Sequence, residues 1–365
     1  MKYVFVSYNF SPTFNAPESW FERTEMHAGI LESLSKENTV INVKQINYEG
    51  THIYNGVDYR FVNCNRKKTH FPIRLNRYIK KLNPDIVFVH GLHNPLQIIQ
   101  LRLILKKKTK IIAQNHAEHP YGGFKKYLQR MADVFVNAYF FPSHAMGMEW
   151  IKRGNLANPE KIFEVMEVSS SFYPIAKSLA KEKTGVTGNP VFLWVLRLNP
   201  VKDPLTVVKA FLQFVEHKPS ARLYMIYHTE DLLAQVKEVL DRSTKKSAVT
   251  LVGKVQHDEL LYWFNSADIL ISGSHHEGSN TALCEAMSCG CMPLVTDIPS
   301  FRMMTDNGNC GMLYEAGNQE ALVNTLMQTS HLNIAEKQRK SREYFISNLS
   351  FDAIANRIKE IAASL

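Results

Sequence analysis

Two glutamates eight positions apart carry the clearest potential chemistry of this sequence. Glu277 and Glu285 lie in the run GSHHEGSNTALCEAMSCGCMPLVTD, directly after an apolar, strand-like stretch. Glu277 is expected in a turn that ends at Gly278, and Ser279 and Asn280 are residue types that favour a helix N-cap. The pattern predicts a strand, a loop that carries Glu277, and a helix with Glu285 about one turn inside it.

That helix is predicted over Thr281 to Ser288, with Gly290 as its C-cap. The backbone N–H groups of about Asn280 to Leu283 then lack helical partners and lie at the positive end of the helix dipole. Such an end binds phosphate groups well. The segment therefore places a candidate diphosphate site beside two carboxylates.

Strand-like apolar runs alternate with helix-length segments along the chain, which is typical of α/β folds with parallel sheets. In the first half the expected strands are Tyr3 to Ser7, Thr39 to Val43, Ile86 to His90, Lys110 to Ala113 and Asp133 to Phe141. In the second half they are Val191 to Val195, Arg222 to Tyr227, Val249 to Val252, Ile269 to Ser272 and Met292 to Val295. Two doubly wound, Rossmann-like domains are therefore expected.

A stretch rich in Pro, Gly, Lys and Ser separates the two series. We predict an N-terminal domain over residues 1–172, a linker over 173–190, and a C-terminal ligand-binding domain over 191–348. A final helix over 349–365 could belong to either domain, and packing back on the N-terminal one is one alternative. Because ligands bind at the carboxyl ends of parallel strands, two domains facing each other across a cleft favour a nucleotide-type ligand. Dehydrogenases and epimerases would fit this fold equally well.

The run from Gly273 to Asp297 resembles the Glu-x7-Glu motif and its continuation in retaining glycosyltransferases of the GT-B fold, family 4 type. The resemblance implies that Glu285 holds the ribose hydroxyls of a nucleotide-sugar donor and that Glu277 contacts the sugar near its reacting carbon. Carboxylates suit both tasks, since hydroxyls need acceptors and a carboxylate near that carbon stabilises developing positive charge. The donor-binding set also includes Gly278, Ser279, Asn280 and Thr281.

The run FLWVLRLNPVKDPLT resembles a strand-and-loop motif of the same family whose Arg and Lys bind the donor diphosphate. Arg197 and Lys202 match these positions. Two fixed cations can stabilise a departing diphosphate without a metal, and the chain has no Asp-x-Asp pair. We therefore expect no metal and no cofactor besides the nucleotide-sugar. Leu196 and Asp203 replace glycines of the family motif, which leaves the shape of this loop open.

A histidine candidate follows the strand that ends near Ala113, in the run QNHAEHP. Members of the same family commonly have a histidine here, close to the donor sugar, and His116 is the matching position. His119 is the competing candidate. An imidazole can donate or accept a hydrogen bond to a sugar hydroxyl. Residues 9–23 lack the glycines found in many family members, so the resemblance says least about the acceptor.

All of the net charge of +9 lies within residues 1–172, which hold 23 Lys and Arg against 14 Asp and Glu. This excess favours an anionic membrane surface or an anionic acceptor, although ordinary solvated helix faces explain it equally well. No nucleic-acid-binding motif is recognisable. The basic clusters are Arg66 to Lys68, the series Arg74, Arg77, Lys80 and Lys81, then Lys106 to Lys110, and Lys125, Lys126 and Arg130.

Cysteine usage and hydropathy indicate a cytoplasmic protein, with peripheral attachment at the inner face of the membrane as an open alternative. The cysteines show no paired metal-ligand spacing, which favours small, buried packing roles in a reducing compartment. No apolar run reaches the roughly 18 to 20 residues that span a bilayer. The N-terminal run is too short for a signal peptide. The five cysteines are Cys64, Cys284, Cys289, Cys291 and Cys310.

The sequence thus predicts a retaining glycosyltransferase that moves a sugar from a UDP or GDP sugar to an acceptor hydroxyl. A saccharide or lipid-linked acceptor would place it in cell-surface polysaccharide or glycolipid synthesis. A nucleotide-sugar epimerase or hydrolase on the same fold is one alternative, and a non-catalytic binding subunit is another. Neither the sugar, the nucleotide, the linkage nor the oligomeric state can be predicted from these residues.

Overall fold

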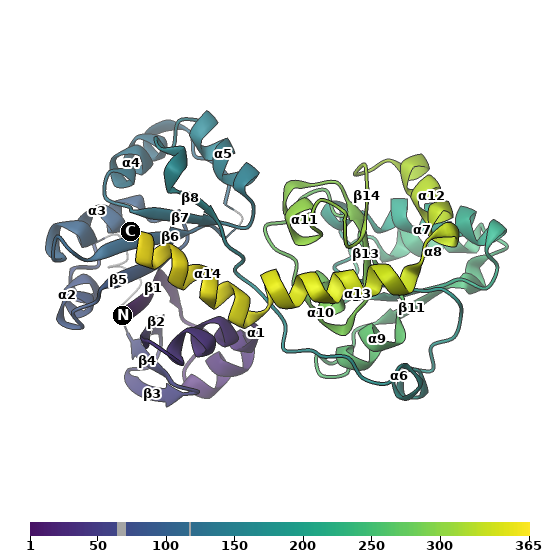
Figure 1. Cartoon of the computed structure of the whole chain (residues 1–365), viewed down its shortest axis with the longest axis horizontal. Helices are drawn as coiled ribbons and strands as arrows, with labels where there is room; N and C mark the ends of the chain where they lie inside the picture. Colours follow the sequence, from purple (N-terminus) through teal and green to yellow (C-terminus); the bar gives the residue numbers. More distant parts are fainter. Residues whose placement is uncertain (64–70, 117) are drawn as a thin grey trace. The chain divides into compact units, whose positions relative to one another are not determined.

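The computed structural model describes residues 1–63, 71–116 and 118–365. Within the first range, only the backbone of residues 22–27 is described. Cys64 and the basic cluster Arg66 to Lys68 therefore lie outside the described residues. The chain divides into two compact units (Figure 1). Unit 1 comprises Met1–Ser169 and Phe351–Leu365, and unit 2 comprises Ser170–Ser350.

Unit 1 is built on an eight-stranded sheet in the order β3-β4-β2-β1-β5-β6-β7-β8. Its strands are β1 (Lys2–Ser11), β2 (Thr39–Ile46), β3 (Gly50–Tyr54), β4 (Val57–Val62), β5 (Ile86–His90), β6 (Lys110–Gln114), β7 (Ala138–Phe141) and β8 (Ile162–Glu164). Its helices are α1 (Pro17–Ser35), α2 (Ile73–Lys81), α3 (Pro95–Ile104), α4 (Gly123–Asp133), α5 (His144–Lys152), the 3-10 turn η2 (Pro159–Lys161) and α14 (Phe351–Ser364).

The sheet of unit 1 is parallel except at one edge, where β3 pairs antiparallel with β4. Asn55 and Gly56 form the two-residue turn between them, and both have positive φ, 47° and 81°. This hairpin was not predicted. The strand expected over Asp133 to Phe141 is shorter than predicted, because α4 extends to Asp133 and β7 begins only at Ala138.

The C-terminal helix α14 packs on α1 within unit 1 (Figure 1). Phe351 lies so close to Gly29 that a Cβ there would be 2.5 Å from its ring. Asp352 accepts hydrogen bonds from Ser33 at 2.6 Å and Lys36 at 2.8 Å. The last helix of the chain thus completes the first unit, next to the helix that covers β2 and β4.

Unit 2 contains a six-stranded, fully parallel sheet in the order β11-β10-β9-β12-β13-β14. Its strands are β9 (Val191–Val195), β10 (Arg222–Ile226), β11 (Val249–Gly253), β12 (Ile269–Ile271), β13 (Met292–Thr296) and β14 (Met312–Tyr314). Its α-helices are α6 (Lys177–Thr184), α7 (Pro204–His217), α8 (Leu233–Asp241), α9 (Leu260–Ser266), α10 (Thr281–Cys289), α11 (Pro299–Met304), α12 (Gln319–Gln328) and α13 (Ile334–Tyr344). Short turns complete it, namely η3 (Pro200–Lys202), η4 (Lys246–Ala248), η5 (Thr329–His331) and the π-helical η6 (Phe345–Leu349).

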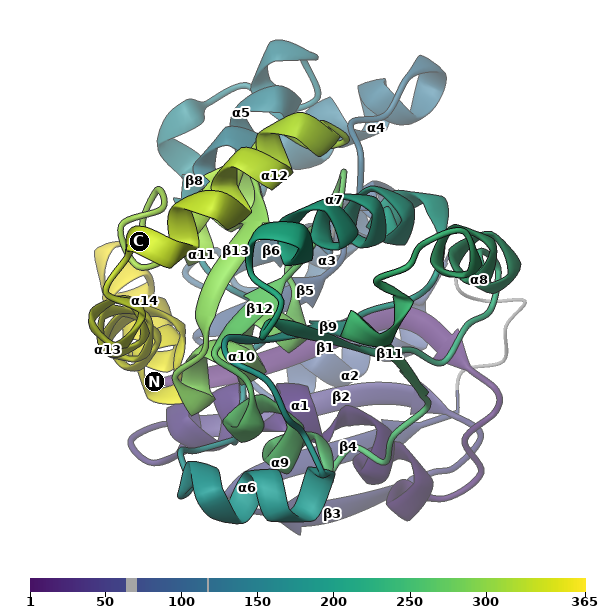
Figure 2. The ribbon, with the colours of Figure 1, turned by 90° about the vertical axis from the view of Figure 1, so that its right-hand side faces the viewer.

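Helices α7 and α12 lie side by side over one face of this sheet (Figure 2). Their apolar residues join those of β9, β10 and β12 in a core that includes Phe192, Trp194, Phe211 and Leu326, all fully buried. The region expected to be a linker, residues 173–190, contains α6, which packs on α9 within unit 2. No helix in the described ranges is both long and apolar enough to cross a bilayer.

Candidate functional site

Glu277 is the centre of a hydrogen-bonded cluster at the carboxyl end of β12. Only 9% of the residue is exposed. Its Oε1 accepts from Lys202 Nζ at 2.6 Å, from Ser274 Oγ at 2.8 Å and from Asn280 Nδ2 at 3.0 Å. A buried carboxylate needs such partners, because an unpaired charge is costly to remove from water. The structure thus brings three of the predicted residues together around one oxygen.

Helix α10 begins and ends as the sequence predicts. The side chain of Asn280 accepts from the Leu283 amide at 2.9 Å, and Gly290 ends the helix with φ 90°. The Leu283 N–H is therefore already occupied and does not belong to the set of amides predicted for a diphosphate. Asn280 has two roles, since its oxygen caps the helix and its Nδ2 holds Glu277.

The loop after β9 carries the two predicted cations in different environments. The side chain of Lys202 is 17% exposed and paired with Glu277. Arg197 is exposed, and none of the described side chains pairs with its guanidinium. Asp203, which stands where the family motif has glycine, adopts a left-handed conformation with φ 44°. Because aspartate tolerates this region and its side chain also caps α7 at Thr206, the turn keeps a shape that glycine would favour.

This loop is fastened to the loop that carries Glu277. The His275 amide donates to the Val201 carbonyl at 2.8 Å, and His275 Nε2 lies 3.2 Å from Asp203 Oδ2. At Gly273 a Cβ would lie 2.9 Å from the Asp203 carbonyl oxygen and 3.2 Å from that of Lys202. The missing side chain of Gly273 therefore allows the close approach that brings Lys202 to Glu277. An isolated glycine directly after a strand is a recognisable signal for such an approach.

Glu285 lies inside α10 and is 4% exposed. Burial raises the pKa of its carboxyl, and the hydrogen bond from His257 opposes the rise without cancelling it. His257 Nε2 lies 2.8 Å from Glu285 Oε1, and its ring centroid lies 5.1 Å from that of Phe172. His257 was not predicted from the sequence, because it lies in the loop after β11 and outside both motifs.

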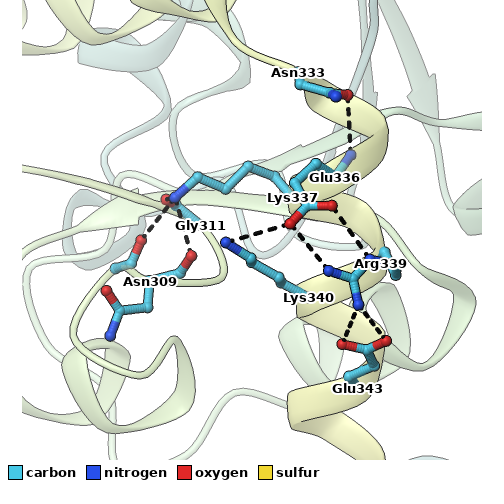
Figure 3. A network of polar contacts seen from close by, with 9 residues as sticks. Asn309, Gly311, Asn333, Glu336, Lys337, Arg339, Lys340 and Glu343 are labelled. Carbon is cyan, nitrogen blue, oxygen red and sulfur yellow. Dashed lines mark hydrogen bonds and ion pairs between the residues drawn. The ribbon is translucent and has the colours of Figure 1, made fainter.

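The segment before β14 is held from the side of α13 (Figure 3). Lys337 donates to three backbone carbonyls, those of Gly308 at 3.3 Å, Asn309 at 3.0 Å and Gly311 at 3.2 Å. Carbonyls that turn toward one ammonium group fix the course of this loop. Lys337 therefore positions the segment from Gly308 to Gly311 that leads into β14.

In unit 1, His116 belongs to a network of histidines and carboxylates at the carboxyl ends of β5 and β6. Its Nδ1 contacts Glu167, and its Nε2 lies 3.1 Å from Nδ1 of His90. With Glu167 accepting from Nδ1, Nε2 of His116 accepts from the Nδ1–H of His90. Glu118 accepts from His93 at 2.8 Å and from the His116 amide at 2.6 Å. Burial alone would raise the pKa of Glu118, but these hydrogen bonds lower it.

A pocket of about 530 Å³ opens beside this network, and all of its lining residues belong to unit 1. His116 lines it, whereas His119 is exposed and is not one of its lining residues. The sequence predicted His116 but missed His90, His93, Glu118 and Glu167, because only the folded sheet assembles them. Hydroxyl groups of a ligand could exchange hydrogen bonds with the imidazoles here.

The described cysteines, Cys284, Cys289, Cys291 and Cys310, are buried and form no disulfide with one another. Burial raises the pKa of each thiol, which makes them unreactive packing residues. Within the described part of the chain, no group of three or more His, Cys, Asp or Glu side chains is placed to hold a metal ion.

The sequence profile of one family, described as glycosyl transferases group 1, matches residues 177–348. That range covers nearly all of unit 2. A similar protein is the poly(glycerol-phosphate) alpha-glucosyltransferase of Bacillus subtilis, which is 30% identical over 170 residues. The match covers 43% of this chain and 24% of that protein, so the chain spans only about a quarter of its relative.

Solved structures resemble the whole chain. HepE of Anabaena in complex with UDP is 14% identical and superimposes with a TM-score of 0.76, covering 100% of each chain. A glycosyltransferase from Rickettsia africae is 18% identical with a TM-score of 0.74, covering 100% of this chain and 98% of that one. These likenesses, with the two α/β units, confirm the predicted GT-B fold class.

Proposed function

We propose that the protein transfers a sugar from a nucleoside diphosphate sugar to an acceptor hydroxyl, with retention of configuration, and the match of residues 177–348 to the glycosyl transferases group 1 profile supports this. One observation carries the proposal, the cluster of Lys202, Glu277 and Asn280 at the N-terminus of α10. A cation, a carboxylate and a helix N-terminus in contact are the groups that a diphosphate sugar requires.

In this proposal, charged residues of unit 2 bind the donor. Lys202 and Arg197 bind the diphosphate together with the backbone around Gly278, Ser279 and Thr281. Glu285 accepts from the ribose hydroxyls, and Glu277 lies beside the sugar. Arg197 is exposed and Glu285 is buried next to a histidine, which suits a flexible phosphate contact and a fixed ribose contact respectively.

In the reaction the bond between the anomeric carbon and the diphosphate oxygen breaks, and a bond to the acceptor oxygen forms on the same face. The hydroxyl proton passes to the departing diphosphate. Lys202 and Arg197 stabilise the charge of the leaving group, and Glu277 stabilises the positive charge that develops on the sugar. Because these cations supply the stabilisation, we propose that the enzyme needs no metal and no further cofactor. His116 hydrogen-bonds a hydroxyl of the transferred sugar.

The donor is of the UDP or GDP type. The complex of HepE with UDP favours UDP, and so do the complexes of the same protein with UDP-glucose. The acceptor is a saccharide or a lipid-linked saccharide used in cell-surface polysaccharide or glycolipid synthesis. This assignment rests on the basic charge of unit 1 and on the exposed face of α4.

Helix α4 presents an apolar stripe to solvent that would suit peripheral attachment to an anionic membrane. Phe124, Tyr127 and Met131 are 76%, 68% and 57% exposed and recur at helical spacing. Lys125 and Lys126 flank them. If α4 binds the inner face of a membrane, the double variant Phe124→Ser/Tyr127→Ser will lose flotation with vesicles containing phosphatidylserine, at unchanged thermal stability. Equal flotation of variant and wild type would exclude α4 as the attachment site.

A donor screen tests the proposed function. Thermal unfolding of the full chain is measured with UDP, GDP, ADP, CMP and their common sugar conjugates, in the presence of EDTA. We expect one nucleotide to stabilise the protein, and Glu285→Ala to lose this response while Glu216→Ala, an exposed glutamate of α7, keeps it. No response to any nucleotide, or an equal response in Glu285→Ala, would overturn the assignment. With the donor known, the anomeric signal of the product in a proton NMR spectrum distinguishes retention from inversion.

A further inference from the structure

The pocket of unit 1 has a polar wall that the proposed reaction does not use. Asn42 and Lys44 lie two residues apart on β2 and therefore point to the same face of the sheet. Tyr59 of β4 is the register partner of Asn42. All three side chains line the pocket, together with apolar residues of α1 and the sheet.

Two of these side chains have polar atoms without a hydrogen-bond partner in the described part of the chain. Asn42 is 2% exposed and its Oδ1 accepts no hydrogen bond there, and the hydroxyl of the fully buried Tyr59 is also without a partner among the described residues. No carboxylate within the described residues pairs with Lys44, whose ammonium lies 5.7 Å from the centroid of the Trp20 ring. Buried polar groups without partners are costly, so two of them on one wall beside a lysine indicate a missing ligand.

At the opposite end of the pocket, the carboxylates are paired with histidines. Glu118 and Glu167 contact His93 and His116, so neither carboxylate is directed at Lys44. His90 lies on β5, and β1 is the only strand between β2 and β5. Two strand spacings amount to about 10 Å. Among the described lining residues Lys44 is the only lysine or arginine, and its strand lies from that of His90 at roughly the length of one substituted sugar.

We propose that this pocket binds the acceptor through an anionic group, a phosphate or a carboxylate, which Lys44 holds while Asn42 and Tyr59 bond to polar groups beside it. The inference rests on the proposed function, because it assigns the substrate class of the same enzyme. The reacting hydroxyl then lies near His90 and His116, about 10 Å from the anion. Trp20 and Phe88 provide apolar surface for the body of the ligand.

The protonation of Lys44 agrees with an anion site. Burial lowers the pKa of Lys44 to about 8, so the side chain is still mostly charged at neutral pH. An anion that contacts the ammonium favours its charged form and raises this pKa. The pKa of Lys44 is consequently a direct reporter of an anion in the pocket, whatever the rest of the ligand is.

The test uses the full chain with 13C-labelled lysine ε-carbons and two probes, inorganic phosphate and acetate, against potassium chloride of equal ionic strength. We expect phosphate or acetate to shift the Lys44 resonance saturably and to raise its pKa. The probe that acts distinguishes a phosphate-bearing from a carboxylate-bearing acceptor. The resonance is assigned by its loss in Lys44→Met. No saturable shift with either probe, or the same shift with chloride, would overturn the proposal.

Calorimetry of the active probe separates this pocket from the donor site. Lys44→Met should weaken binding by about tenfold or more, which corresponds to loss of one charge-assisted contact. Lys107→Met, at an exposed lysine of the same unit, should bind as the wild type does. Anion binding that is lost in Lys202→Met and retained in Lys44→Met would contradict the inference. The nucleotide response is the separate readout of the proposed function, so either conclusion can fail alone.

Discussion

The candidate site of unit 2 and the polar wall of the unit 1 pocket differ in how many of their buried polar atoms have hydrogen-bond partners. In unit 2 Glu277 has three protein partners on one oxygen, and Glu285 is paired with His257. In unit 1 Asn42 and Tyr59 leave polar atoms unpaired, and no described carboxylate approaches Lys44. A site whose polar groups are all hydrogen-bonded within the protein is rigid before a ligand binds. Polar groups without protein partners form their hydrogen bonds only with the ligand.

The two candidate sites also differ in how their residues are distributed along the sequence. The proposed donor site is built from short runs of neighbouring residues, and the family match falls on the same unit. The described lining of the pocket of unit 1 comes from five strands, the loops that follow strands, and helices α1 and α14. The proposed donor site is therefore recognisable from local sequence, whereas the pocket of unit 1 becomes visible only in the fold.

The largest expected effect is on turnover. Glu277→Gln keeps the shape of the side chain and removes the charge that stabilises the sugar, so we expect turnover to fall about 100-fold or more. Release of nucleoside diphosphate from the identified donor measures it. Glu216→Gln, at an exposed site on α7, serves as the control. A loss of less than about threefold would remove Glu277 from the reaction and make unit 2 a binding module only.

The next largest effect is expected from closing the space at Gly273, where two loops of unit 2 meet. In Gly273→Ala the added Cβ meets the Asp203 carbonyl, which cannot move without displacing Lys202. We expect destabilisation of about 1–3 kcal/mol, as for other overpacked sites, and a loss of turnover. Gly122→Ala is the matched control, since nothing lies within 4 Å of that position. Chemical denaturation compares the two, and equal stability would show that the loops are not held by this contact.

The dependence of the free energy of unfolding on pH tests the burial of Lys44 in unit 1. The folded pKa of Lys44, about 8, lies below its ordinary value of 10.5, so the unfolded chain binds more protons between these values and wild-type stability rises from pH 8 to pH 10.5. Lys44→Met should therefore be more stable than wild type at pH 7, by up to about 3 kcal/mol, and the gain should disappear above pH 10.5. Thermal unfolding across this range measures it. A destabilised variant at pH 7 would show that Lys44 has a protein partner.

The smallest effect concerns the turn after Lys202. Asp203→Gly retains the left-handed backbone and loses the α7 cap and the exposed contact with His275, so we expect a change of less than about 1 kcal/mol. Asp203→Val places a β-branched residue at positive φ and should cost more than about 1 kcal/mol. Thermal unfolding ranks the two variants, and the reverse order would contradict the conformational argument.

The elements of unit 2 could be predicted because their signals are local. Asn280 and Gly290 mark both ends of α10, and the apolar runs of β9 to β13 are short and separated by helical segments. The hairpin of β3 and β4 was missed although Asn55-Gly56 is a strong turn signal, since the flanking strands alternate apolar and polar residues instead of forming a continuous apolar run.

Contacts between distant segments could not be predicted. His257 meets Glu285, and Glu167 meets His116, only because separate strands end at the same edge of a sheet. The unpaired state of Asn42 and Tyr59 is likewise invisible in a sequence, because it depends on which side chains the fold leaves out of reach. The sequence thus predicts the residues of a motif better than their partners.

Nucleotide binding by Lys202→Met tests the central claim most directly. The nucleoside diphosphate identified in the donor screen is titrated into wild type, Lys202→Met and Lys209→Met, an exposed lysine on α7, by calorimetry in EDTA. We expect Lys202→Met to bind at least about tenfold more weakly, as loss of one charge-assisted contact implies, and Lys209→Met to bind like wild type. Equal affinity in Lys202→Met would contradict a diphosphate site at the N-terminus of α10.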